Sequence, residues 1–320
     1  MKRFIYFPLS LLIIACNLPV PADAAPPTAL MDTNTPPPST PTLAPVSTDL
    51  PTLPPAPTPT VTPIPCDPTT TDYCISAWVF PFQRPILPPD MDRVDMSYMY
   101  ASTQNRKRDP HHGVEFQNAF GTPVHAAGNG VVVFADSDKA TKFAPWNNFY
   151  GNLVVIQHAD EMYTLYAHLS SILVQVGDEV AVGDVIGQVG ATGGATGPHL
   201  HFEVRAGSDY TEYFSTQNPE LWLAPPYGMG ALSITFKAGN EKNYERPMVI
   251  SKYADDSETL QFTYYVSSYA KGFEYHPEDC VLNSLQAGRY KIAFSDAGGL
   301  HERFVVVAEG RLTEVVFEVK

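Results

Sequence analysis

The feature that most restricts the fold is a proline- and threonine-rich run near the N-terminus. In the linker, residues 17–74, the part up to about residue 71 consists mostly of Pro, Thr, Ser and Ala and is almost free of aromatic side chains. Such a segment cannot bury enough apolar surface to fold. Its prolines favour extended polyproline II segments, so we expect a disordered stalk that reaches on the order of 100 Å or more. Any folded core must therefore come from the chain after this linker.

After the linker the sequence changes to short β-branched runs separated by glycines, such as residues 130–134, 152–156 and 184–189. Many short strands with glycine-rich turns and no long helical period are typical of antiparallel β structure. We therefore predict a mostly β, antiparallel domain over residues 75–226.

The last part of the chain, residues 227–320, has a second β pattern. Tyr290, Ile292 and Phe294 occupy alternate positions, which predicts a strand with one buried face. Residues 285–290 and 304–310 resemble segments of carboxypeptidase-regulatory-like or transthyretin-like sandwiches. We expect a small C-terminal β-sandwich, and this resemblance names no activity.

The N-terminus, residues 1–16, has the pattern of an export signal. Three residues, MKR, precede an apolar run that is too short to span a bilayer. The run ends at residues 13–16 (IIAC), which resemble the lipobox of bacterial lipoproteins and make Cys16 the expected lipidation site. The alternative is an ordinary secretory signal cut near residues 22–25. Either interpretation predicts a protein outside the cytoplasm, and the first one anchors it to the outer face of the cytoplasmic membrane or elsewhere in the cell envelope.

Three further cysteines, Cys66, Cys74 and Cys280, remain after this signal. An exported protein can form disulfides. Cys66 and Cys74 bracket a short loop and are the natural pair, which would fix the end of the linker and leave Cys280 as a buried thiol. The sequence alone leaves other pairings open.

The charge balance argues against nucleic acid as a partner. Acidic residues outnumber basic ones 34 to 20, giving a formal net charge of -14. The basic side chains form only one short cluster, at residues 106–108. Nucleic-acid binding normally requires a basic surface.

Histidines and one acidic residue in two short segments predict a metal site. In an extended strand alternate side chains share a face, so His199 and His201 should point the same way. By the same rule His111 and Glu115 share a face if their segment is extended, and Gly113 between them leaves room for an ion. Two His and one Glu are a recognised catalytic zinc set that leaves a fourth position for water.

Five segments resemble, in order and spacing, the signatures of the lysostaphin-type (LytM-like) zinc endopeptidases that cut peptidoglycan. They are HHGVEF (111–116), GTPVHAA (121–127), YGNLVVIQH (150–158), TLYAHL (164–169) and GPHLHFE (197–203). The resemblance covers roughly residues 108–222, and the whole series is far more specific than a single His-x-His. It implies an antiparallel β peptidase domain related to duplicated-hybrid or barwin-like folds.

Residue by residue, the resemblance implies that His111, Glu115 and His201 bind one zinc ion per catalytic domain. His168 and His199 would stand on the substrate side. His199 is the candidate general base and His168 the candidate for stabilising the oxyanion or orienting the water, although the two roles can be exchanged. The family usually has Asp where Glu115 stands, so this carboxylate lies one methylene further from the backbone. We expect a Glu to coordinate zinc there all the same.

The implied function is zinc-dependent hydrolysis of amide bonds in peptidoglycan stem peptides or cross-bridges during cell-wall remodelling. The alternative is a catalytically inactive wall-binding or hydrolase-activating lipoprotein of the same fold. A biotin or lipoyl carrier is rejected because no Lys lies between Gly183 and Arg205. The expected partners are peptidoglycan and, through Cys16, the membrane. The C-terminal region would bind wall glycan, dock a protein of the cell wall, or brace the catalytic unit.

Overall fold

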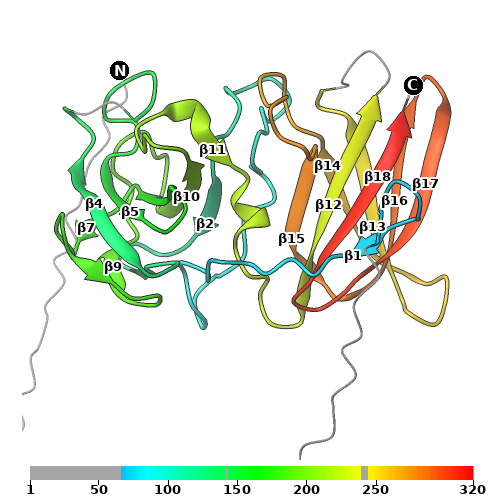
Figure 1. The fold of residues 1–320 in the computed structure, drawn as a ribbon, viewed down its shortest axis with the longest axis horizontal. Helices are drawn as coiled ribbons and strands as arrows, with labels where there is room; N and C mark the ends of the chain where they lie inside the picture. Colours follow the sequence, from blue (N-terminus) through cyan, green and yellow to red (C-terminus); the bar gives the residue numbers. More distant parts are fainter. Residues whose placement is uncertain (1–65, 141–142, 239–243, 320) are drawn as a thin grey trace, which may run out of the picture. The chain divides into compact units, whose positions relative to one another are not determined.

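The computed structural model describes residues 66–140, 143–238 and 244–319, which all belong to one unit of the chain, Thr62–Lys320. Within these residues the chain forms β-strands and two short 3-10 helices, with no α-helix (Figure 1). The predicted mostly β, antiparallel fold is thus confirmed. Among the described segments, no helix has the length and apolar character needed to cross a membrane. Cys16 and most of the predicted stalk lie outside the described residues.

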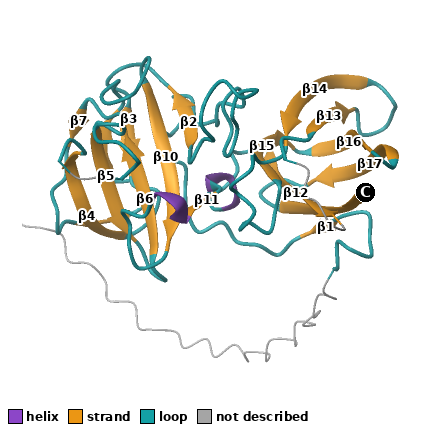
Figure 2. Cartoon of the chain, turned by 90° about the horizontal axis from the view of Figure 1, so that it is seen from above, coloured by secondary structure: helices purple, strands orange, loops and turns teal. Residues whose placement is uncertain are grey.

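The N-terminal β region, which we define as β2 to β11, contains two antiparallel sheets. The seven-stranded sheet has the order β11-β10-β6-β5-β4-β8, with β2 also paired to β10, and the three-stranded sheet has the order β3-β9-β7. Figure 2 shows these sheets as one strand-rich body. The strands are β2 (Val114–Gln117), β3 (Pro123–His125), β4 (Gly130–Ser137), β5 (Asn152–Gln157), β6 (Met162–Ala167), β7 (Ser171–Ile172), β8 (Glu179–Val180), β9 (Val185–Gln188), β10 (His199–Ala206) and β11 (Thr216–Gln217). The 3-10 helices are η1 (Tyr213–Ser215) and η2 (Pro219–Leu221).

Strand β10 lies in the seven-stranded sheet between β2 and β11 on one side and β6 on the other. Its first half pairs with β2, and most of its length pairs with β6 on the other side. The alternate side chains Leu200, Phe202 and Val204 are fully buried in the larger apolar core of this region. The intervening polar side chains therefore share the opposite face of the strand.

The C-terminal sandwich, which we define as β1 and β12 to β18, consists of two four-stranded sheets. Their orders are β1-β18-β12-β15 and β14-β13-β16-β17, and only the pair β12–β18 is parallel. Apolar side chains from both sheets form one shared core, as the alternation at Tyr290, Ile292 and Phe294 predicts. The strands are β1 (Cys74–Ile75), β12 (Met229–Ala238), β13 (Pro247–Tyr253), β14 (Leu260–Ser267), β15 (Cys280–Gln286), β16 (Gly288–Asp296), β17 (Gly299–Val307) and β18 (Leu312–Val319).

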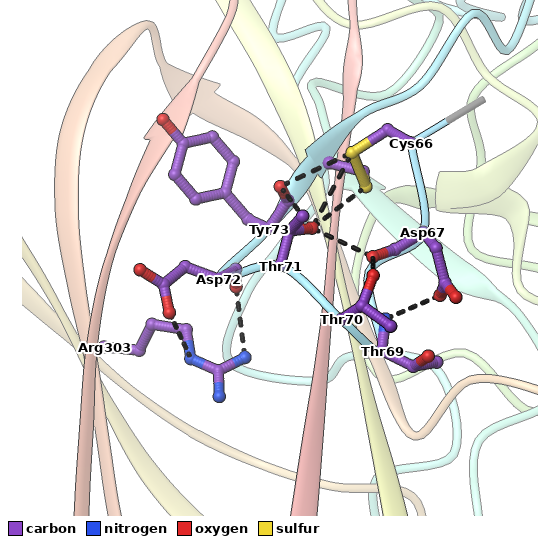
Figure 3. Close-up of a disulfide and its surroundings, with 9 residues drawn as sticks. Cys66, Asp67, Thr69, Thr70, Thr71, Asp72, Tyr73 and Arg303 are labelled. Atoms are coloured by element: carbon purple, nitrogen blue, oxygen red, sulfur yellow. Dashed lines mark hydrogen bonds and ion pairs between the residues drawn. A yellow bond between two sulfur atoms is a disulfide. The ribbon is translucent and has the colours of Figure 1, made fainter. Parts of the chain in front are cut away.

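The end of the linker is attached to this sandwich rather than to the N-terminal β region. Cys66 and Cys74 form a disulfide, and Cys74 lies in β1, which pairs with β18. Figure 3 shows the closed loop with Arg303 beside it, where Arg303 Nη1 donates to Asp72 O at 3.0 Å. Cys280 is a buried free thiol. The end of the linker thus pairs with β18, the last strand of the chain, before the chain enters the N-terminal β region.

The two β regions are joined by buried polar contacts. Arg84 donates to Ala224 O at 2.9 Å and, from Nη2, to Asn283 Oδ1 at 2.7 Å. Burial lowers the pKa of Arg84 to about 10. The backbone N–H of Asn283 in β15 donates to Glu220 Oε2 at 2.7 Å. Because buried polar groups need partners, these contacts fix the two regions against each other.

Candidate metal centre

Three side chains converge on one face of the β2–β10 pair. Glu115 on β2 is the direct cross-strand partner of His201 on β10, and His111 lies just before β2. His111 Nε2 is 3.0 Å from Glu115 Oε1 and 3.2 Å from His201 Nδ1, and the latter is 3.2 Å from Glu115 Oε1. All three residues are buried. The structure therefore brings together the three ligands predicted from the sequence.

The spacing of these three atoms fits a zinc ion. Tetrahedral zinc lies about 2.0–2.2 Å from His nitrogen and carboxylate oxygen, which places ligand atoms about 3.3–3.6 Å from one another. The observed triangle, with edges of 3.0, 3.2 and 3.2 Å, needs to expand by only a few tenths of an ångström. Glu115 reaches its place in the triangle despite its extra methylene.

Hydrogen bonds at the other ring nitrogens prepare both imidazoles for a metal. His111 Nδ1 lies 3.0 Å from Tyr98 O, and a carbonyl can only accept, so this nitrogen carries the proton and Nε2 offers a lone pair. His201 Nε2 donates to Glu203 Oε1 at 3.0 Å, which directs Nδ1 toward the triangle. Metal-ligating histidines usually have such a partner on the second nitrogen.

Behind His201 lies a buried chain of polar side chains that the sequence analysis assigned no role. Glu203 and Arg205, both fully buried, interact through Oε2 and Nε at 2.8 Å, and Tyr150 Oη donates to Glu203 Oε1 at 2.5 Å. Burial opposes ionisation of Glu203, but Arg205 and then His201 outweigh it and lower its pKa to about 2. Glu203 thus stays ionised as the partner of His201. The signal was present in the sequence, because residues 199, 201, 203 and 205 share one face of a strand.

The carboxylates control the protonation of His201 in the metal-free protein. Burial lowers the pKa of His201, but Glu115 and then Glu203 outweigh burial and raise it to about 9. The pKa of Glu115 is well below its usual value, since His201 and His111 overcome the opposing effect of burial. A metal held by His201 Nδ1 would compete with a proton for this nitrogen.

The two predicted catalytic histidines flank the triangle. His199 Nδ1 donates to Gly197 O at 2.9 Å and His168 Nδ1 donates to Thr192 O at 2.9 Å, so each ring has Nε2 as its remaining nitrogen. The ring centroids lie 4.8 Å apart. His199 Nε2 is also 2.9 Å from Glu115 Oε2, the carboxylate oxygen outside the triangle. Burial lowers the pKa of His168 to about 3, so that imidazole is neutral.

Gly113 allows His111 and Glu115 to approach His201. A Cβ at this position would lie 2.6 Å from Phe202 O and 2.8 Å from two atoms of the His201 ring. The space that the sequence analysis assigned to an ion is thus needed by the His201 ring itself. The strand pairing of β2 begins only at Val114, so His111 takes its place through the hydrogen bond to Tyr98 rather than through strand geometry.

A cavity of about 530 Å³, which we call the metal hollow, lies over these side chains. His111, Glu115, His168, His199 and His201 all line it. Its walls carry aromatic rings from three separate segments together with a basic side chain: Tyr98, Arg108, Trp146, Phe149 and Tyr213. The neighbouring His112 contacts the Tyr213 ring with a centroid separation of 3.8 Å. The hollow has room for a peptide beside the metal triangle.

Residues 109–213 match the sequence profile of Peptidase family M23. The chain therefore contains a peptidase M23 domain, and this domain carries the metal triangle and both flanking histidines. The match ends before the C-terminal sandwich.

Relatives of this domain include named peptidoglycan hydrolases. The chain is 47% identical over 95 residues to the peptidoglycan DD-endopeptidase ShyA of Vibrio cholerae, covering 30% of this chain and 20% of that protein. It is 46% identical over 95 residues to the DD-carboxypeptidase/endopeptidase Mpg of Neisseria meningitidis, with the same coverage. The chain thus spans about a fifth of the length of these curated relatives. Among solved structures, the lysostaphin catalytic domain of Staphylococcus simulans shares 36% identity at a TM-score of 0.31, covering 35% of this chain and 78% of that one.

Proposed function

We propose that the protein is a zinc-dependent endopeptidase that hydrolyses amide bonds in the stem peptides or cross-bridges of peptidoglycan. The observation that carries the proposal is the triangle of His111 Nε2, Glu115 Oε1 and His201 Nδ1, with edges of 3.0 to 3.2 Å at the base of an open hollow. The names of the M23 relatives support peptidoglycan as the substrate.

His111, Glu115 and His201 would hold the ion, which when bound supplies a Lewis acid that activates water and polarises the scissile carbonyl. His199 is our candidate general base, because the bond from its Nδ1 to Gly197 O turns Nε2 toward the triangle, where it lies 2.9 Å from Glu115 Oε2 and would accept the proton of the attacking water. The same nitrogen would return that proton to the leaving amine as the C–N bond breaks. His168, bonded to Thr192 O in the same way, would orient the water through Nε2 or, once that nitrogen carries a proton, stabilise the oxyanion, and the roles of His168 and His199 can be exchanged.

We further propose that Cys16 is lipidated and that the stalk, residues 17–74, holds the folded part away from the membrane. The catalytic domain would occupy residues 75–226 and the C-terminal sandwich residues 227–320. The support for the anchor is the sequence pattern of residues 1–16. Such an anchor would keep the metal hollow close to the cell wall.

The test is to measure zinc content and wall cleavage on the same sample. The mature chain with Cys16→Ser, which prevents lipidation, should contain about one zinc ion per chain and release soluble fragments from purified sacculi. Chelation should abolish the release and added zinc should restore it. His201→Ala should lose both zinc and activity, because only two of the three ligands remain.

Two results would contradict the proposal. A protein that takes up no zinc would exclude metal-dependent hydrolysis by this triangle. A protein that binds zinc but cleaves neither sacculi nor cross-linked peptides would favour the inactive wall-binding or hydrolase-activating alternative.

A further inference from the structure

A second depression, which the proposed function does not use, separates the segment before His111 from the C-terminal sandwich. This sandwich groove has a volume of about 1110 Å³. One wall is formed by residues 96, 97, 99, 100 and 102–107. The other is formed by side chains of β13, β14 and β16, with Leu300 of β17 and the neighbouring residues 244, 245 and 268. The groove thus lies between the segment before β2 and the C-terminal sandwich.

The sandwich groove and the metal hollow share a rim. Ser97 and Gln104 line both depressions, and Gln104 Nε2 donates to Ser97 O at 3.1 Å. A polymer that lies in the metal hollow can therefore continue across Ser97 and Gln104 into the groove. Such a continuous surface suits a substrate in which a second polymer is attached to the peptide that is cleaved.

The groove crosses its sheet instead of following a free strand edge. Tyr265 on β14, Val249 on β13 and Ala293 on β16 are direct cross-strand neighbours, and all three line it. Their row spans about 10 Å across three strands. An extended peptide usually binds a sheet by pairing its backbone with an edge strand. This row presents side chains, rather than unpaired backbone groups, to a ligand.

The side chains of the groove suit an uncharged sugar chain. Tyr265 is 82% exposed and Leu300 is 69% exposed, so a flat aromatic ring and an aliphatic group are available above a floor that includes Met99 and Met248. The C–H faces of pyranose rings pack on such surfaces. Hydroxyl groups, including those of Ser97 and Ser267, can exchange hydrogen bonds with sugar hydroxyls and acetamido groups.

The rim is held in place before any ligand binds. Ala270 N donates to Ala101 O at 3.1 Å, and the Thr103 hydroxyl donates to the carboxylate of Glu245. Arg106 Nε lies 3.4 Å from Glu245 Oε2, and Lys107 is a second basic side chain beside this pair. A preformed site loses little free energy to ordering on binding.

We propose that the sandwich groove binds the glycan strand of the wall polymer whose peptide lies in the metal hollow. The inference rests on the proposed function for the identity of the polymer, because peptidoglycan carries its peptides on glycan strands. The groove would align a strand so that its attached peptide crosses the Ser97–Gln104 rim toward the metal.

The experiment measures binding to peptide-free glycan. The mature chain with Cys16→Ser and His201→Ala, which should bind without cutting, is titrated with fluorescent glycan strands from which an amidase has removed the peptides. Tyr265→Ala should weaken binding roughly threefold to tenfold, and Leu300→Ser should also weaken it. Tyr265→Phe keeps the ring and should bind like the parent. Tyr227→Ala is the matched control, because Tyr227 is 98% exposed and lines neither depression.

The inference is overturned if peptide-free glycan does not bind, or if Tyr265→Ala binds it as tightly as the parent does. It is also overturned if Tyr265→Ala weakens the binding of free stem peptides but not of glycan. Cleavage of a cross-linked peptide dimer that lacks glycan, by the chain with His201 intact, tests the proposed function separately. If the dimer stays uncut but glycan binding depends on Tyr265, only the proposed peptidase activity is contradicted. If the dimer is cut but glycan does not bind, only the proposed glycan site is contradicted.

Discussion

Strands β10 and β16 have the same alternating pattern but opposite environments for their polar side chains. In β16 the inward residues Tyr290 and Ile292 are fully buried, while the intervening Lys291 keeps 24% of its side chain exposed. In β10 the apolar face is buried, and Glu203 and Arg205 on the polar face are fully buried as well. The polar face of the sandwich strand thus meets water, whereas this part of the polar face of β10 is covered by protein.

The difference arises from a second cluster that covers the polar face of β10. Phe143, Tyr150 and Leu165 are fully buried and belong to this cluster, and Tyr150 bonds directly to Glu203. Charges removed from water destabilise a protein unless they are paired. In β10 each charge has a partner. In β10 the buried charges thus lie beside the metal triangle, whereas in β16 the intervening polar side chains keep contact with water.

Replacing Glu203 should have the largest effect on this comparison. Glu203→Gln leaves Arg205 as a buried charge without its counter-ion, so we expect unfolding free energy to fall by roughly 3–5 kcal/mol. Zinc affinity should fall about tenfold to a hundredfold, since the amide is a weaker acceptor for His201 Nε2. Chelator competition and urea unfolding measure the two effects.

The matched control for this substitution is Glu318→Gln, on an exposed position of β18, which should change neither quantity. If Glu203→Gln binds zinc as tightly as the parent while losing stability, Glu203 is only a structural partner of Arg205. The polar chain behind His201 would then have no influence on the metal.

A cavity in the sandwich should separate stability from metal binding. Ile292→Ala removes a fully buried side chain of β16, so we expect a loss of about 2–5 kcal/mol in unfolding free energy with zinc affinity unchanged. Leu200→Ala makes a matched cavity in β10, between His199 and His201, and should lower both quantities. Urea unfolding and chelator competition measure the two quantities for both variants. Equal losses of zinc affinity in the two variants would show that the cores are coupled.

The alternation of residues 199–206 predicts β10 and the shared face of His199 and His201, and the family segments predict the ligand trio. Alternation alone cannot predict that Glu203 and Arg205 are buried, because period two does not reveal what covers a face. The role of Tyr98 O also has no local signal, since it lies 13 residues before His111 and acts through a loop.

The attachment of the linker to the sandwich is a second feature that local sequence patterns could not predict. Cys74 and Ile75, at the end of the predicted linker, pair with Glu314 and Thr313 of β18, a contact that the sequence did not predict. A two-residue strand contains too little pattern to identify a partner at the other end of the chain. Such pairings depend on the assembled sheet.

The smallest effect should come from Glu115→Asp. This substitution tests whether the metal triangle requires the longer side chain of Glu or only its carboxylate. Glu115 lies directly opposite His201 across β2 and β10, so a small strand shift would bring the shorter carboxylate into place. We expect zinc content to be retained and wall solubilisation to stay within about tenfold of the parent. The contact between the second oxygen and His199 Nε2, at 2.9 Å, would be lost in this variant. Glu115→Gln, which keeps the length but removes the charge, is the control that should lose zinc. If the Asp variant loses zinc as well, this β2–β10 pair requires the extra methylene, and length as well as charge defines the ligand.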